Sequence, residues 1–193
     1  ALYGICIVCM PVIAAIAATA PALVPFLLGD EWADAAPLLQ ILAPAAGAAI
    51  VTAALKWAYY VEGHTGRLLR WSALTLPVTT VAVAIGGWWG ATGVAVAWSA
   101  SSLALVVPAT VWCVRTSTLD FGDVWRPFAR CAVAAVGGAF AAVAVIGRQS
   151  TGLGDVVVGT VVVCVVFASV FIALPGGRAA VRELIRAART VRG

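Results

Sequence analysis

Residues 71–114 read WSALTLPVTTVAVAIGGWWGATGVAVAWSASSLALVVPATVWCV and contain no charged residue. The run is about twice the ~20 residues that an α-helix needs to cross the hydrocarbon layer of a membrane. Near its middle, GGWWGATG (86–93) gathers glycines, which interrupt helices, and tryptophans, which favour the membrane interface. The run therefore predicts two membrane-spanning helices, over about 71–88 and 93–113, joined by a short turn.

The rest of the chain has the same character. Of its 193 residues, 63% are hydrophobic and 10% are charged, and its mean hydropathy is +1.06. Soluble domains are nearer half apolar and about a quarter charged. Alanine, valine and leucine dominate in long runs, which is typical of helical bundles and not of the alternating ~10-residue strands of a membrane β-barrel. The composition excludes a soluble domain and predicts an all-α, polytopic transmembrane bundle.

Four more apolar runs of suitable length flank the central stretch, and short charged patches separate them. They cover about 3–28, 37–60, 130–147 and 156–174. The chain begins inside the first of these runs, with neither a basic region nor a small-residue cleavage site, so we do not expect a signal peptide there. We expect six spans in this chain and further spans before its first residue.

Arginines mark one side of the membrane. Ten of them fall in the loop after the second span, in the loop after the fourth span and in the tail, whereas Arg148 is the single one on the opposite side. The positive-inside rule assigns the arginine-rich side to the cytoplasm. Both ends of the chain are therefore expected to be cytoplasmic, which requires an even number of spans.

Prolines divide the spans into two groups. The first four contain or end on Pro11, Pro21, Pro25, Pro44, Pro77 and Pro108, whereas Pro127 and Pro175 only bracket the last two. Interior prolines kink membrane helices, because they remove a backbone hydrogen bond. We expect residues 1–115 to form four shaped, moving transmembrane helices, and residues 116–174 to form two straighter peripheral helices.

The remaining residues, 175–193, form a basic tail. Its apolar residues recur at Val181, Leu184, Ile185 and Ala188, with arginines between them. This helical spacing predicts a basic amphipathic helix on the inner leaflet. Membrane lipids are therefore an expected partner; nucleic acid is not, because the positive-inside topology already accounts for the charge.

An acidic cluster follows the first span. Asp30, Glu31 and Asp34 surround Trp32 in FLLGDEWADAAPLLQ (26–40). Carboxylates at a helix start oppose the positive end of the helix dipole, so Asp30 is expected to cap the second span, with Glu31 and Asp34 in its first turn. A metal or proton site is the alternative, although the segment does not supply the ligand spacing of a calcium loop.

Other residue types that carry chemistry are few. Cys6 and Cys9 form C-x-x-C inside an apolar span, and His64 is the single histidine, so neither a redox pair nor a zinc set is expected. No span holds a Ser/His/Asp set or an aspartate pair. Four polar residues of the fourth span are expected to pack between helices, namely Ser99, Ser101, Ser102 and Thr110. We therefore predict no catalytic residue, no cofactor and no metal site.

Three cations are the candidate substrate-binding residues. Lys56 is the one ionisable side chain clearly inside a span, and such a residue is a functional candidate by default. It lies near the cytoplasmic end, so it could instead extend to the interface or pair with Glu62. Arg67 and Arg70 lie in the cytoplasmic turn EGHTGRLLR (62–70), which is either a solvated loop or a contact for the phosphate of a lipid-linked substrate.

Three motifs in a fixed order resemble one family. The first is Gly29, Trp32, Ala36, Leu38, Leu39, Ile41 and Leu42; the second is Gly66 and Arg67; the third is Trp89, Gly90, Gly93 and Ala95. Over about 26–115 the chain resembles the C-terminal part of bacterial polysaccharide flippases, the O-antigen and lipopolysaccharide exporters of the multidrug/oligosaccharidyl-lipid/polysaccharide exporter superfamily.

The resemblance implies a transporter of the bacterial cytoplasmic membrane and not an enzyme. Such proteins have two lobes of six helices plus a terminal pair, and flip undecaprenyl-diphosphate-linked oligosaccharide by alternating access. The implied partners are a lipid-linked oligosaccharide and the missing N-terminal lobe of the same protein. Alternative functions are a drug/cation antiporter of the same superfamily, which the absence of acids inside the spans disfavours, a membrane-embedded glycosyl- or acyltransferase fragment, and a non-catalytic scaffold.

Overall fold

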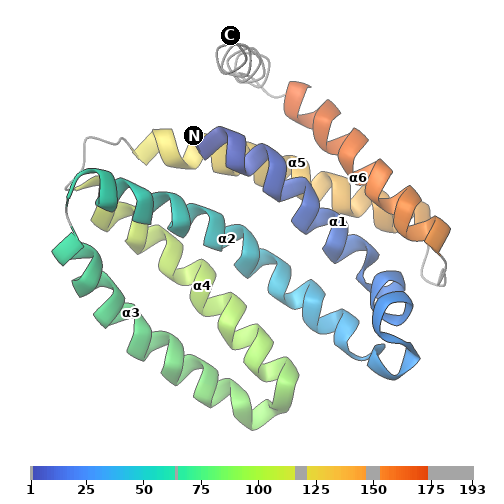
Figure 1. Ribbon diagram of the computed structural model, residues 1–193, viewed down its shortest axis with the longest axis horizontal. Helices are drawn as coiled ribbons and strands as arrows, with labels where there is room; N and C mark the ends of the chain where they lie inside the picture. Colours follow the sequence, from blue (N-terminus) through green and yellow to red (C-terminus); the bar gives the residue numbers. More distant parts are fainter. Residues whose placement is uncertain (1, 64, 116–120, 147–152, 174–193) are drawn as a thin grey trace.

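The computed structural model describes residues 2–63, 65–115, 121–146 and 153–173, and these ranges are helical apart from short turns (Figure 1). The elements are, in chain order, α1 (Leu2–Leu28), the 3-10 helix η1 (Asp30–Trp32), α2 (Ala35–Val61), α3 (Thr65–Gly86), the 3-10 helix η2 (Gly87–Trp89), α4 (Gly90–Val114), α5 (Phe121–Ile146) and α6 (Leu153–Ala173). The prediction of an all-α fold is confirmed for the described residues.

Five helical stretches are long and apolar enough to cross a membrane. They are Gly4–Leu28, Ala35–Val61, Thr65–Val114, Trp125–Val145 and Gly154–Ala173, and the third contains both α3 and α4. Large apolar side chains cover their outer surfaces; Phe140 is 73% exposed and Val165 is 61% exposed. An apolar surface of this extent suits lipid better than water. The described helices therefore fit a multi-pass membrane protein.

Helix boundaries agree with the predicted spans in α1 and α2 but not in α3 and α5. The helix α3 begins at Thr65, and α5 begins at Phe121, so both start well before the predicted spans. Arg67 and Arg70 consequently lie in the first turns of α3 and not in a loop, and Pro127 lies inside α5. The prediction that the fifth span has no interior proline is wrong. Hydropathy detects the lipid-facing length of a helix, whereas backbone hydrogen bonding continues into its polar end.

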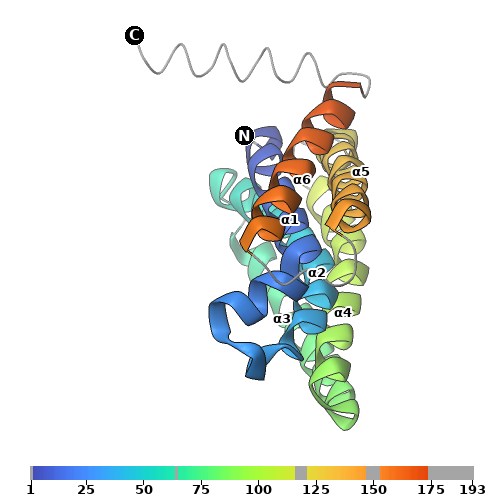
Figure 2. The ribbon, with the colours of Figure 1, turned by 90° about the vertical axis from the view of Figure 1, so that its right-hand side faces the viewer.

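Within the described ranges the helices enclose two larger apolar cores and a third, small cluster of Ala20, Val24 and Ala36. The first joins α1, α5 and α6, with Cys6, Cys131 and Val163 completely buried, and it also includes Ile50 of α2. The second lies between α2 and α4, around Val51 and Cys113. Figures 1 and 2 show α1 beside α5 and α6, whereas α3 packs chiefly on α4 at the edge of the molecule. The predicted domain boundaries stay predictions, and residues 175–193 lie outside the described residues.

The connection between α1 and α2 is a separate 3-10 turn. Gly29 ends α1 with φ 94° and ψ 163°, and its N–H donates to the Pro25 carbonyl at 2.8 Å. The next turn is closed by Ala33 N–H to the Asp30 carbonyl at 3.1 Å. Asp30 and Glu31 therefore belong to η1, and Asp34 directly precedes α2.

The prediction that Asp30 caps the second span is therefore wrong. An N-cap side chain accepts a hydrogen bond from the N–H of the second or third helical residue. In α2 the second residue is Ala36, whose N–H already donates to the Ala33 carbonyl at 3.1 Å. The third is Pro37, which has no N–H. The residue directly before α2 is Asp34, whereas Asp30 lies four residues earlier, inside η1.

The connection between α3 and α4 is shorter and is built on glycine. Gly90 begins α4 with φ 71° and ψ −159°. A Cβ on Gly86 would lie 2.5 Å from the Gly93 carbonyl oxygen, and a Cβ on Gly93 would overlap the Gly86 carbonyl oxygen. The two helices thus meet backbone to backbone directly beside their turn. The motif Trp89-Gly90-Gly93 has a steric explanation at this turn.

Candidate functional site

The three predicted cations lie where α2 ends and α3 begins. Lys56 is on the last third of α2, and Arg67 and Arg70 are on the first two turns of α3. All three side chains are exposed. Gly63, with φ 72°, ends α2 and allows α3 to start two residues later. The structure therefore gathers the cations at one end of a helix pair, opposite the acidic η1 turn, which lies at the other end of α2 (Figure 1).

Lys56 borders a small pocket between three helices. The pocket has a volume of about 30 Å³ and is lined by Thr52, Leu55, Lys56 and Tyr59 of α2, Leu68 and Trp71 of α3, and Ala109 of α4. A water molecule needs roughly 10–15 Å³ by the same measure, so the pocket has room for about two waters. Arg67 and Arg70 do not line it. The structure thus places Lys56, but neither arginine, at the pocket.

Tyr59 is a site residue that sequence reasoning missed. Its side chain is 3% exposed, and its hydroxyl group is buried with no hydrogen-bond partner among the described residues. The hydroxyl lies beside the Cys113 thiol and close enough to Arg67 and Glu62 for their charges to act on it. A buried hydroxyl without a partner is costly, so this position favours a polar ligand or a water. The helical spacing of Thr52, Lys56 and Tyr59 on one face could have indicated it.

Aromatic side chains lie near Lys56: Trp71 lines the same pocket, and Trp112, which is 39% exposed, lies next to Trp71. The rings of Trp71 and Trp112 have centroids 6.0 Å apart, and Trp71 packs against the apolar core that contains Tyr59. Trp57, next to Lys56, meets Tyr60 edge to face at 6.4 Å on the outer surface. The site therefore combines an exposed ammonium group, a buried hydroxyl and nearby aromatic side chains. This arrangement can bind an anionic, partly apolar group at the membrane surface.

The Lys56–Glu62 ion pair, an alternative at the sequence level, is not seen among the described residues. Glu62 is half-buried at the end of α2 and takes part in an interaction of its own. Lys56 is exposed and lines the pocket. The position of Lys56 therefore agrees with a side chain that reaches the interface and with one that meets a substrate.

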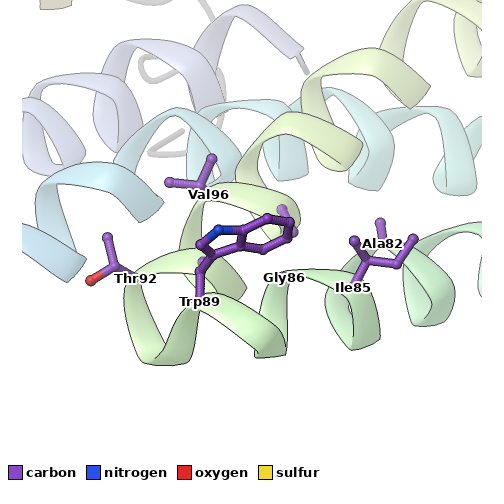
Figure 3. A pocket seen from close by; sticks show the side chains of 8 residues that line it. Ala82, Ile85, Gly86, Trp89, Thr92 and Val96 are labelled. Carbon is purple, nitrogen blue, oxygen red and sulfur yellow. The ribbon is translucent and has the colours of Figure 1, made fainter.

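A second hollow lies beside the α3–α4 turn. It is an open groove of about 510 Å³ lined by apolar and small residues, with Trp89 at one side (Figure 3). Figure 3 shows the Trp89 indole between Val96 of α4 and the Gly86 end of α3. The groove has no charged lining residue. Its mostly apolar lining suits an acyl chain or a neighbouring helix, and Thr92 and Trp89 supply its side-chain polar groups.

The cysteines and acids form no ligand set within the described part of the chain. Cys6 is completely buried in the first core, where it lies beside Cys131, and Cys9 is partly buried one turn later in α1. Among the described residues, no group of three His, Cys, Asp or Glu side chains lies close enough to hold a metal ion. His64 lies outside these residues.

Comparisons with family models, with curated proteins and with solved structures gave no match to this chain.

Proposed function

We propose that this chain is the C-terminal part of a bacterial transporter that flips lipid-linked oligosaccharide or polysaccharide precursors across the cytoplasmic membrane. It crosses the membrane six times with both ends in the cytoplasm, and it acts by alternating access and not as an enzyme. The remaining helices of the transporter belong to a first lobe of the same protein.

The observation that carries this proposal is the position of the three motifs in the fold. The residues from Gly29 to Leu42 form the α1–α2 connection and the start of α2. Gly66 and Arg67 lie in the first turn of α3, and Trp89 to Gly93 form the α3–α4 connection. The three motifs thus lie at three successive helix ends, so their order along the chain follows the order of the helices. This supports the resemblance to polysaccharide flippases.

The cation cluster suits the head group of such a substrate. A lipid-linked oligosaccharide carries a diphosphate between its apolar tail and its sugars. Lys56, Arg67 and Arg70 offer charge-assisted hydrogen bonds to phosphate oxygens, and Trp71 and Trp112 offer apolar ring surfaces. Arginines at the cytoplasmic end of membrane helices also attract anionic lipid head groups. We expect the diphosphate to enter between α2 and α3.

Entry requires the pocket to open, because a volume of about 30 Å³ cannot hold a diphosphate. The helix α3 packs chiefly on α4 and has little contact with α2 (Figure 1). Movement of the Thr65 end of α3 away from α2, with α4 still packed on α2, would therefore break few contacts at the α2–α3 boundary. Such opening and closing of one boundary is what alternating access needs.

The test is transport in liposomes by the purified full-length protein, with its first lobe included. The vesicles contain undecaprenyl-diphosphate oligosaccharide with a fluorescent sugar, and a membrane-impermeant quencher reports the fraction in the outer leaflet. We expect Lys56→Ala to slow the initial rate about tenfold, because a charged hydrogen bond to phosphate is lost, and Lys56→Arg to retain most of it.

Arg126→Ala is the matched control, since Arg126 is another exposed arginine near the predicted cytoplasmic side, on α5. It should transport at the wild-type rate. A wild-type rate equal to that of protein-free liposomes contradicts the transport proposal. Transport that is equally fast with Lys56→Ala retains the transporter but removes Lys56 from the binding site.

A further inference from the structure

Pro21 leaves a backbone carbonyl of α1 without its helical hydrogen bond, and a side chain of α2 donates a hydrogen bond to that carbonyl instead. Proline has no N–H, so a proline inside a helix leaves the carbonyl four residues earlier without its usual donor. For Pro21 that carbonyl belongs to Ala17. The Gln40 side-chain amide, Nε2, donates a hydrogen bond to the Ala17 carbonyl oxygen at 3.1 Å.

A second interhelical bond lies one residue further along α2. Pro44 has no N–H to bond the Gln40 carbonyl, which directly precedes the Ile41 carbonyl in α2. The Ser99 hydroxyl of α4 donates to the Ile41 carbonyl oxygen at 2.5 Å, and Ser99 is buried. By contrast, Ser101 and Thr110 of α4 donate to carbonyls of their own helix.

The two bonds are made by adjacent residues of α2. Gln40 reaches α1 with its side chain, and its neighbour Ile41 accepts from α4 with its carbonyl. Figure 2 shows that the C-terminal part of α1 turns away from the direction of the rest of the helix. This is the part that follows the carbonyl to which Gln40 is bound. The bend in α1 and the proline turn of α2 are therefore linked through adjacent residues.

We infer that Gln40 and Ser99 join the Pro21 and Pro44 bends into one coupled hinge, so that α1 changes its bend only together with α2 and α4. In hydrocarbon an unpaired carbonyl is costly, because no water replaces the lost partner. If α1 bent alone, the Ala17 carbonyl would lose Gln40. The coupling is reciprocal, as any linkage between two equilibria must be. The inference does not depend on the proposed transport function.

The first experiment is a double-mutant cycle on the whole chain in bicelles, measured as the equilibrium constant of unfolding by a denaturing detergent. We expect Gln40→Ala, and the similarly sized Gln40→Met, to shift that constant toward unfolding about three- to twentyfold, the range of interhelical hydrogen bonds in membranes. In a Pro21→Ala background the residue 21 N–H can again bond the Ala17 carbonyl. Gln40→Ala should then change the constant less than twofold. An equal effect in both backgrounds overturns the inference.

Thr52→Ala is the matched control on α2, because Thr52 donates only to carbonyls of its own helix. It should show the same effect in the protein that retains Pro21 and in the Pro21→Ala background. A dependence on Pro21 as large as that of Gln40 would mean that the cycle reports general loosening and would count against the specific link.

The second experiment tests the coupling without removing a proline. Nitroxide-bearing non-natural amino acids replace Leu28, at the end of α1, and Phe140 of α5, both of which are exposed. We expect Ser99→Ala to broaden the distance distribution between them, although the Ser99 bond is to α2 and not to α1. Ser101→Ala should leave it unchanged. Broadening by Gln40→Ala alone means that the two bends move separately and contradicts the coupled hinge.

Discussion

The pairs α1–α2 and α3–α4 have the same plan but are held together by different interactions. Each consists of two long helices joined by a 3-10 turn, and each turn has one glycine in a conformation that other residues avoid. Between α1 and α2 the link is polar, from Gln40 to the Ala17 carbonyl. Between α3 and α4 it is steric, because Gly86 and Gly93 let the backbones touch.

The difference follows from where the prolines lie relative to the helix contact. In α1 the Pro21 bend leaves a carbonyl that must find a donor, so a polar side chain on the neighbour stabilises the contact. In α3, Pro77 lies nine residues before Gly86, away from the Gly86–Gly93 contact with α4, and this contact needs small residues instead. A helix pair in a membrane can therefore be fixed by hydrogen bonding or by close approach, according to which backbone groups are already satisfied.

The substitution with the largest expected effect disrupts the close contact between α3 and α4. Gly93→Val should destabilise the protein by at least about 1–3 kcal/mol, because even its Cβ would overlap the Gly86 carbonyl and meet Trp89 Cβ. Detergent-induced unfolding measures the loss. Gly66→Ala on α3 is the control, since a Cβ there meets no atom within 4 Å, and it should be nearly neutral. A neutral Gly93→Val would mean that α3 and α4 do not approach closely.

The next two substitutions should lower stability equally in the α1–α2 pair and in the α3–α4 pair. Gly29 (φ 94°, ψ 163°) and Gly90 (φ 71°, ψ −159°) occupy a region of backbone conformation that is essentially restricted to glycine. A Cβ at either position meets nothing within 4 Å, so the cost of alanine is conformational alone. We expect Gly29→Ala and Gly90→Ala each to lower the free energy of unfolding by about 1–3 kcal/mol. If one of the two substitutions is neutral, the two turns do not share a backbone plan.

The substitutions with the smallest expected effect on stability test on which side of the membrane the two turns lie. Glu31→Cys and Ala91→Cys replace exposed side chains at the two turns, and Gly66→Cys lies at the opposite end of α3. We expect a membrane-impermeant thiol reagent, added to intact cells, to label positions 31 and 91 but not 66, with stability changed by less than about 0.5 kcal/mol. Labelling of position 66 alone would reverse the proposed orientation.

Much of the candidate site could be anticipated from the sequence. Lys56, Arg67 and Arg70 are rare charges among apolar residues, and the structure places all three at the meeting point of α2 and α3. The pocket itself could not be predicted, because it depends on Leu68, Trp71 and Ala109 from two other helices. Tyr59 was missed since a tyrosine near a span end is usually explained by its preference for the interface.

The sequence alone determined the helical, membrane-type fold and the approximate course of α1 and α2, because hydrophobic length and glycine position are local properties. It also indicated Ser99 as a packing residue, and the bond to Ile41 confirms this. Only the tertiary structure decided that Gln40 meets Ala17, that Gly93 meets Gly86, and that α3 and α5 continue through their polar ends. These depend on which backbone groups a neighbouring helix brings within reach, and a linear pattern does not contain that information.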